Sequence, residues 1–161
     1  MISRLVTGPE DIDRIMAVMA SAFDPAFGEA WTRRQVEDAL LIGNCHYLLV
    51  APGGGEPGTD GKTAGFCLSR AGFEEEELLL FAVAPPYRRG GLGWTMLERL
   101  AEQARGRGAS RLLLEMRDGN PAESLYRRYG FEPIGRRPDY YRTPGGNRID
   151  AVTFAKVLET D

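Results

Sequence analysis

The chain has 161 residues, 43% of them hydrophobic and 27% charged, which is the balance of an ordinary globular protein, so we expect one domain over residues 1–161. The formal net charge of -3 argues against nucleic acid as a general partner, and no stretch approaches the roughly 20 apolar residues of a membrane span. Cys45 and Cys67 fit no metal or redox motif, and no signal peptide is recognisable, which favours a cytoplasmic protein with reduced thiols.

Two helices are predicted near the N-terminal end of the chain. Residues 8–23, GPEDIDRIMAVMASAF, place their apolar side chains on one helical face. A second helix is expected to begin directly after Thr32. Thr32 and Gln35 have the spacing of a capping box, and Trp31 and Val36 have the spacing of a hydrophobic staple.

Three strands are predicted in the middle of the chain. HYLLVA, residues 46–51, and AGFCLSRA, residues 64–71, read as a hairpin, and the glycine-rich residues 52–62 form its long connection. ELLLFAVAPP, residues 77–86, is nearly all apolar before its two prolines. We therefore expect the third strand to be buried on both faces and to end at the prolines.

The second half of the chain predicts a strand–helix–strand unit that begins with residues 77–86. YRRGGLGWTMLERL, residues 87–100, opens a helix, and RLLLEM, residues 111–116, is the next strand. Such a unit joins two parallel strands, and ligands bind beyond the carboxyl ends of strands in sheets of this kind. PAESLYRRYG, residues 121–130, predicts a short helix ended by its glycine, and RIDAVTFAKVL, residues 148–158, a strand that closes the sheet.

Three glycines, Gly90, Gly91 and Gly93, stand at the helix entrance behind Arg88 and Arg89. The first amide groups of a helix have no partner within it, and the helix dipole makes that end positive. Glycines let the backbone approach a phosphate, and arginines add charge-assisted hydrogen bonds. The pattern lacks the Gly-Lys-Ser/Thr ending of a triphosphate loop and the spacing of a dinucleotide fingerprint. It predicts either a pyrophosphate cradle or a loop whose glycines serve tight turns.

Arg88, Gly91 and Gly93 fit the pattern Arg/Gln-x-x-Gly-x-Gly/Ala, which resembles the acetyl-CoA-binding motif of the GNAT superfamily of N-acetyltransferases. Residues 112–141, LLLEMRDGNPAESLYRRYGFEPIGRRPDYY, are similar to one branch, the bacterial ribosomal-protein-alanine N-acetyltransferases. The likeness is good over residues 77–158 and looser before them. It implies an α/β fold whose central mixed sheet is partly splayed and flanked by helices. It also implies acetyl transfer from acetyl-CoA, without a metal, to the N-terminal α-amine of a ribosomal protein.

The resemblance implies roles for single residues in a direct attack of the amine on the thioester. Glu115 matches the general base and Tyr126 the general acid, although a solvated strand-end carboxylate and a packing tyrosine are the alternatives. They enclose ten residues, one fewer than is usual in the family, so Asn120 or Gly119 takes the place of an asparagine that contacts coenzyme A. The implied cofactor-binding residues are Phe81, Ala82 and Val83 for the pantetheine arm, Arg88, Arg89, Gly90, Gly91, Leu92 and Gly93 for the phosphates, and Asn120.

The acceptor side of the site is expected from charge and from aromatic residues. Residues 74–77, EEEE, are either a solvated hairpin edge or an acidic rim that attracts a basic peptide, with Glu77 the best candidate beside Glu75. Tyr140 and Tyr141 are expected to line a peptide groove. The alternatives are acetylation of a small-molecule amine or of a lysine side chain, and a non-catalytic acetyl-CoA-binding module. The sequence does not indicate the oligomeric state.

Overall fold

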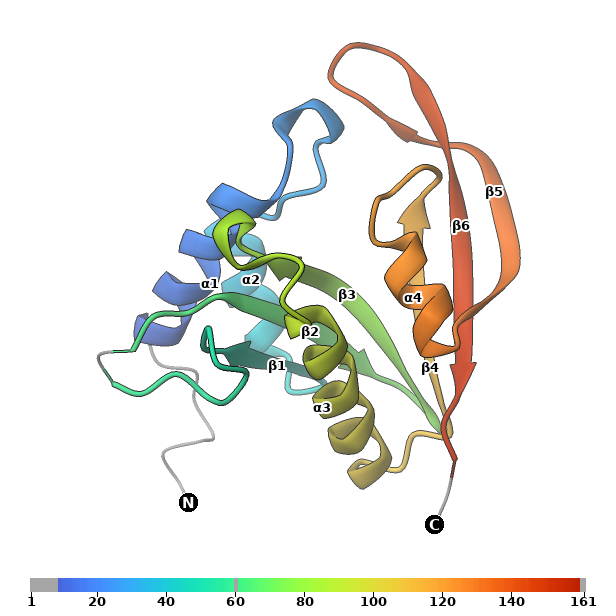
Figure 1. Cartoon of the computed structure of the whole chain (residues 1–161). Coiled ribbons are helices and arrows are strands. Elements are labelled where there is room, and N and C mark those ends of the chain that lie inside the picture. Colours follow the sequence, from blue (N-terminus) through green and yellow to red (C-terminus); the bar gives the residue numbers. More distant parts are fainter. Residues whose placement is uncertain (1–8, 60, 160–161) are drawn as a thin grey trace.

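A computed structural model describes residues 9–59 and 61–159. Its centre is a six-stranded sheet in the order β1-β2-β3-β4-β6-β5, in which β3 and β4 are parallel and the other neighbours antiparallel (Figure 1). The mixed sheet expected from the resemblance is confirmed. The strands are β1 Cys45–Val50, β2 Gly65–Ala71, β3 Glu75–Val83, β4 Arg111–Arg117, β5 Glu132–Arg142 and β6 Arg148–Val157.

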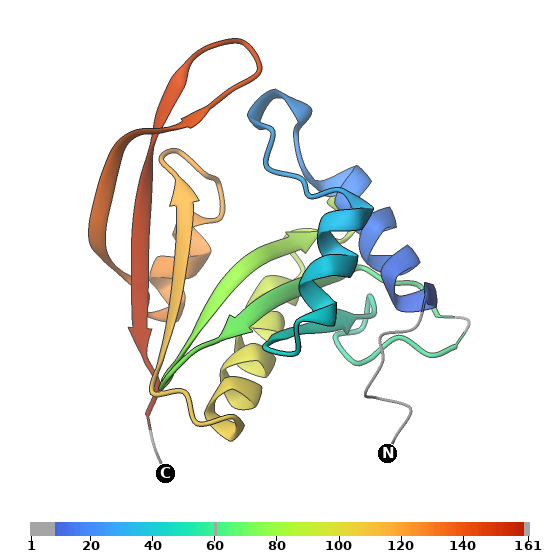
Figure 2. The same cartoon turned by 180° about the vertical axis from the view of Figure 1, so that it is seen from behind.

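Helices cover both faces of the sheet. A core cluster on one face joins α1 and α2 to β1, β2 and β3, as Figure 2 shows from behind. A second cluster, on the opposite face, joins α3 and α4 to the sheet. The helices are α1 Pro9–Ala22, α2 Arg33–Leu41, α3 Leu92–Gly106 and α4 Glu123–Tyr129, with short 3-10 turns at Pro25–Phe27 and Pro85–Tyr87. No helix in residues 9–59 and 61–159 is long and apolar enough to cross a membrane.

The local signals read from the sequence are confirmed at helix ends. Thr32 accepts a hydrogen bond from the amide of Gln35, and the Gln35 side chain accepts one from the amide of Thr32, so the capping box is complete. Trp31 and Val36 belong to the same core cluster. Gly130 ends α4 in the left-handed conformation, with φ of 114°. Each of these features depends on residues close in sequence, which is why spacing alone predicts them.

The parallel pairing of β3 and β4 covers only Glu75–Leu78 and Arg111–Leu114, and beyond these residues the two strands separate. A β-bulge lies at the same place, because Leu68 of β2 pairs with Leu80 whereas the next residue, Ser69, pairs with Leu78. The splayed sheet implied by the resemblance is therefore confirmed. The expectation that this strand is buried on both faces is wrong, since buried and half-buried residues alternate along β3.

The C-terminal strands differ from the sequence prediction. Residues 148–158 were expected to close the sheet, but β6 lies inside it and β5 forms the edge. Spacing did not indicate β5, because ten of its residues are exposed and only Tyr141 is half-buried, so no hydrophobic alternation marks it. Its ladder with β6 provides the backbone hydrogen bonds that make it a strand.

Within residues 74–77, which the sequence left open as a solvated edge or an acidic rim, Glu76 alone is buried and forms an ion pair with Arg107. The Glu76 side chain is inaccessible to solvent, and Arg107 donates from Nε to Oε1 at 2.9 Å and from Nη2 to Oε2 at 2.6 Å. The Ser69 hydroxyl also donates to Oε2. Burial by itself would raise the pKa of Glu76, but the hydrogen bonds from Arg107 and Ser69 and the Arg107 charge lower it below its ordinary value.

Replacing Arg107 by methionine leaves the Glu76 carboxylate buried without a counter-charge, so we expect the free energy of unfolding to fall by about 3–5 kcal/mol. The matched control is Arg111→Met, which breaks the half-exposed pair with Glu75 and should cost less than about 1 kcal/mol. Urea denaturation at pH 7 measures both variants, and equal losses would contradict the special role of the buried pair.

The loss of stability in Arg107→Met should depend on pH. Because the folded protein lowers the pKa of Glu76, its ionised form stabilises the fold above the unfolded pKa, and this contribution is lost as the pH falls through the folded pKa. In Arg107→Met the buried carboxylate has lost its partner. Burial without the Arg107 charge raises the pKa of Glu76 in the variant, so the difference in stability between wild type and variant should begin to narrow above about pH 4 and should narrow further as the pH falls through the lowered folded pKa of the wild type.

Candidate active site

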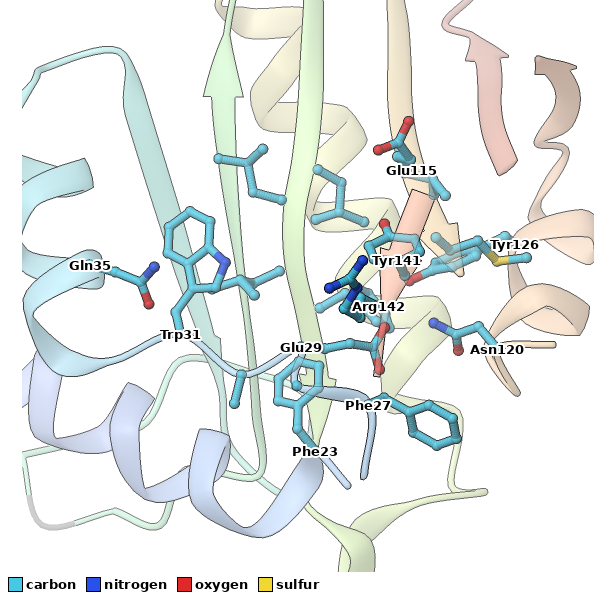
Figure 3. A pocket seen from close by; sticks show the side chains of 18 residues that line it. Phe23, Phe27, Glu29, Trp31, Gln35, Glu115, Asn120, Tyr126, Tyr141 and Arg142 are labelled. Carbon is cyan, nitrogen blue, oxygen red and sulfur yellow. The ribbon is translucent and has the colours of Figure 1, made fainter. Parts of the chain in front are cut away.

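A pocket of about 370 Å³ opens where β3 and β4 separate (Figure 3). Its walls come from the bulged part of β3, from the end of β4, from the segment between α1 and α2, from α4 and from β5. Trp31 and Gln35 stand on one side, and Glu115, Asn120 and Tyr126 on the other. The pocket thus brings together the predicted residues Phe81, Glu115, Asn120, Tyr126 and Tyr141.

Glu115 lies near the carboxyl end of β4 and points into the pocket. Its side chain is only 20% exposed, so it is not the freely solvated strand-end carboxylate that the sequence left open. The Thr153 hydroxyl donates to Oε2 at 3.3 Å, and Nε of Arg137 lies 3.4 Å from the same oxygen. A carboxylate that is held on one side and faces a pocket on the other has the geometry of a general base.

Tyr126 reaches the pocket from α4. Its ring packs edge-on against Phe81 and Phe131, with ring centroids 5.8 Å apart in each pair. Burial raises its pKa well above the ordinary value of a phenol, so the hydroxyl keeps its proton. The packing role and the proposed acid role are therefore compatible, since the ring fixes the position of a protonated hydroxyl at the pocket wall.

Asn120 lies in the turn between β4 and α4. Its side-chain oxygen accepts a hydrogen bond from the amide of Ala122 at 2.9 Å, which orders the entrance to α4. Asn120 lines the pocket, whereas Gly119, with φ of 86°, is absent from the lining. The geometry therefore favours Asn120 over Gly119 at the position left open by the shortened spacing.

The glycines at the entrance to α3 have different structural roles. Gly91 is the N-cap residue with φ of 85°, and a Cβ there would meet no atom within 4 Å, so a ligand can approach the backbone. At Gly93 a Cβ would lie 2.7 Å from Cδ2 of Leu125, so this glycine lets α3 pack closely against α4. Arg89 adopts a φ of 67°, which makes the turn into the helix tight.

The Arg88 side chain anchors the glycine-rich turn before α3 (the predicted pyrophosphate cradle) to two neighbouring elements. Its Nε donates to the carbonyl of Val83 at 2.9 Å, and its Nη2 donates to the carbonyl of Ala22 at 2.9 Å. The guanidinium thus joins the end of β3 to the end of α1 instead of extending towards a phosphate. Between Leu78 and Val83, β3 has no ladder partner on the β4 side within the described residues, and this free edge connects the pocket to the cradle.

The structure places two predicted acidic residues away from the pocket. Glu77 pairs with Arg70 at 2.7 Å, and Glu75 pairs with Arg111 at 2.9 Å. On β3 the lining of the pocket begins at Leu78 and contains neither glutamate. Cross-strand and neighbouring arginines hold both carboxylates at the other half of β3, so the acidic rim stays a prediction about residues outside the pocket lining.

The two adjacent tyrosines of β5, Tyr140 and Tyr141, differ in their position relative to the pocket. Tyr141 is half-buried and lines the pocket, and burial, followed by the charge of Glu115, raises its pKa to about 12. Tyr140 is 52% exposed and does not line the pocket. Its ring packs edge-on against Tyr141 at 5.3 Å.

Sequence reasoning missed the segment between α1 and α2, which supplies Phe27 and Glu29 to the pocket. Arg117, at the end of β4, lies 3.6 Å above the centre of the Phe27 ring and 3.2 Å from Oε1 of Glu29. The segment has no periodic pattern, so its only sequence signal is Asp24 before a proline, which caps the short turn Pro25–Phe27.

Residues 14–131 match the model of the acetyltransferase (GNAT) family. The chain belongs to this family. It is 33% identical over 142 residues to a candidate ribosomal protein bS18-alanine N-acetyltransferase of Bacillus subtilis (strain 168), which covers 87% of each protein. It is 39% identical over 97 residues to the ribosomal protein bS18-alanine N-acetyltransferase of Escherichia coli (strain K12), which covers 60% of this chain and 65% of that enzyme.

Solved structures agree with the family. The Escherichia coli ribosomal-protein-S18-alanine N-acetyltransferase superimposes with a TM-score of 0.77 at 27% identity, covering 97% of this chain and 93% of that one. An aminoglycoside 6'-N-acetyltransferase complexed with coenzyme A gives a TM-score of 0.73 at 12% identity, over 96% of this chain and 94% of that one, which shows a shared fold. GNAT enzymes use acetyl-CoA, and the open backbone at Gly91 fits a bound pyrophosphate.

Replacing Gly91 by aspartate places a side chain and a negative charge in the path of the pyrophosphate, so we expect acetyl-CoA to bind at least tenfold more weakly to this GNAT protein. Gly108→Asp is a matched control, because Gly108 also has a positive φ, of 94°, and open space at its Cβ, but lies beyond the other end of α3. Isothermal titration calorimetry on both folded variants measures the affinities. Equal affinities would remove Gly91 from the cofactor site.

Proposed function

We propose that this protein transfers the acetyl group of acetyl-CoA to the N-terminal α-amine of a protein, and that its acceptor is a ribosomal protein beginning with alanine. The observation that carries the proposal is one pocket holding both Glu115 and Tyr126 at the end of the free β3 edge that leads to Gly91. The names of the relatives from Bacillus subtilis and Escherichia coli support this acceptor. A ribosomal acceptor implies that the enzyme works in the cytoplasm.

Glu115 deals with the proton of the acceptor amine. An α-amine has a pKa near 7.7–8.0, so about a tenth is neutral at pH 7, whereas a lysine amine near 10.4 is almost wholly charged. The difference corresponds to about 3–4 kcal/mol of deprotonation cost, at 1.36 kcal/mol for each pH unit. A single carboxylate at the pocket wall therefore suits an α-amine better than a lysine side chain.

Tyr126 acts on the departing sulfur. Bound acetyl-CoA supplies the activated acetyl group. Because burial raises the pKa of Tyr126 far above the value near 8.5 of a thiol, complete proton transfer to the thiolate is uphill. The hydroxyl instead stabilises the developing negative charge as a hydrogen-bond donor. Tyr141, whose pKa burial and Glu115 raise to about 12, is a second protonated hydroxyl at the same pocket.

The cysteines support a direct attack of the amine without an acyl-enzyme. Cys67 is fully buried, and burial raises its pKa to about 12. Burial also raises the pKa of Cys45. Neither Cys45 nor Cys67 lines the pocket. Since a nucleophilic cysteine needs a lowered pKa and access to the substrate, neither thiol fits a covalent route.

Glu115→Gln and Tyr126→Phe should each lower kcat by roughly 10²-fold, the first because acid–base assistance is lost and the second because a hydrogen-bond donor to the developing thiolate is lost. Both replacements keep the shape of the side chain, so acetyl-CoA affinity should stay close to that of wild type. Tyr140→Phe is the control, because its hydroxyl lies outside the pocket. Release of the coenzyme A thiol measures the rates, and near-normal turnover in Tyr126→Phe would transfer the role of hydrogen-bond donor to Tyr141.

The acceptor is tested with two peptides of the same sequence. One has a free N-terminal alanine, and the other has a blocked N-terminus and a free internal lysine. After incubation with acetyl-CoA, mass spectrometry should find the acetyl group on the alanine amine of the first peptide and little modification of the second. Acetylation of the lysine alone, or of small polyamines but neither peptide, would overturn the protein N-terminal acceptor while leaving the family unchanged.

A further inference from the structure

Both contacts of the Glu115 carboxylate fall on one oxygen atom. Oε2 accepts a hydrogen bond from the Thr153 hydroxyl at 3.3 Å and lies 3.4 Å from Nε of Arg137. Among the described residues no hydrogen bond is made to Oε1, and Glu115 lines the pocket. The two oxygens of this carboxylate are therefore in different environments, one held by protein groups and one free to meet a substrate.

This asymmetry follows from the register of three neighbouring strands. Glu115 of β4 stands opposite Thr153 of β6, and Thr153 stands opposite Gly135 of β5. Side chains at opposite positions of an antiparallel ladder share a face and come within contact distance. Because Gly135 has no side chain, Arg137, two residues along β5, can reach across Thr153 to Glu115. The guanidinium of Arg137 also lies 5.0 Å from the centre of the Tyr140 ring, which gives this exposed arginine a second support.

We propose that Thr153 and Arg137 are positioning residues for the reaction, which hold Oε2 of Glu115 so that Oε1 is the oxygen that takes the proton of the acceptor amine. The proposal rests on the proposed function, in which Glu115 is the base. One hydrogen bond and one ion-pair contact on the same oxygen restrict rotation of the carboxylate, and a base held in one orientation needs less rearrangement when the amine arrives.

The hydrogen bond from Thr153 and the ion-pair contact of Arg137 can be removed one at a time. Thr153→Val keeps the shape of the side chain but loses the hydroxyl, and Arg137→Gln loses the charge. We expect each to lower kcat roughly 2- to 10-fold, the effect of one hydrogen bond, while the KM for acetyl-CoA stays unchanged. Thr153→Ser restores the hydroxyl and should restore the rate. Arg136→Gln is the control for loss of charge, because Arg136 pairs with Asp118 and Asp150 rather than with Glu115.

A double-mutant cycle separates positioning from a general effect on the fold. Thr153→Val and Arg137→Gln are each combined with Glu115→Gln, and kcat is measured by release of the coenzyme A thiol. If both act through the carboxylate, they should have little further effect in the Glu115→Gln background. An undiminished effect in that background would overturn the inference while leaving Glu115 as the base. A normal kcat in Glu115→Gln alone would overturn the base assignment as well, so the two failures are distinguishable.

Discussion

The separation of β3 from β4 beyond Leu78 is the constraint on which the rest of the structure depends. A parallel pair that continued to the ends of both strands would fill the space where the pocket lies, and would satisfy the backbone of β3 up to Val83. The bulge between Leu78 and Leu80 accompanies the separation and turns the side chains, so that Leu78 joins the core beneath α3 and Leu80 joins the core beneath α1. The pocket and the free edge of β3 thus lie where the bulge and the separation coincide.

Because the sheet opens between β3 and β4, contacts are needed that join the part with β1, β2 and β3 to the part with β4, β6 and β5. Arg117 provides one of them, since it extends from β4 to Phe27 and Glu29 in the segment between α1 and α2, with only 11% of its side chain exposed. The tip of that segment also comes near the turn after β5, where a Cβ on Gly28 would lie 3.9 Å from Pro144. Both hairpin-like projections rise at the same end of the molecule in Figures 1 and 2. The wall of the pocket at this end is therefore built jointly by the segment between α1 and α2 and by β5.

The arginines of this chain perform structural tasks that their positions in the sequence do not reveal. Arg88 stands in the cofactor-binding pattern but joins two backbone carbonyls, and Arg107 stands at the end of α3 but neutralises a buried carboxylate. Arg137 stands in an exposed strand but contacts the proposed base. The guanidinium group suits all three tasks because it is planar, keeps its charge and offers several donors in fixed directions.

The sequence by itself determined the helices, the capping box at Thr32, the end of α4 at Gly130 and the cofactor pattern that indicates the family, since each is encoded by residues close together in the chain. Glu115 and Tyr126 could be named because residues 112–141 resemble the family, which implies their roles, and both side chains line the pocket. Only the tertiary structure decided that β5 forms the edge, that the pairing of β3 and β4 stops at Leu78, and that the glutamates before β3's apolar stretch are held in ion pairs with arginines. These features arise from strand pairing and burial between distant segments, and periodicity along one segment carries no information about its partner.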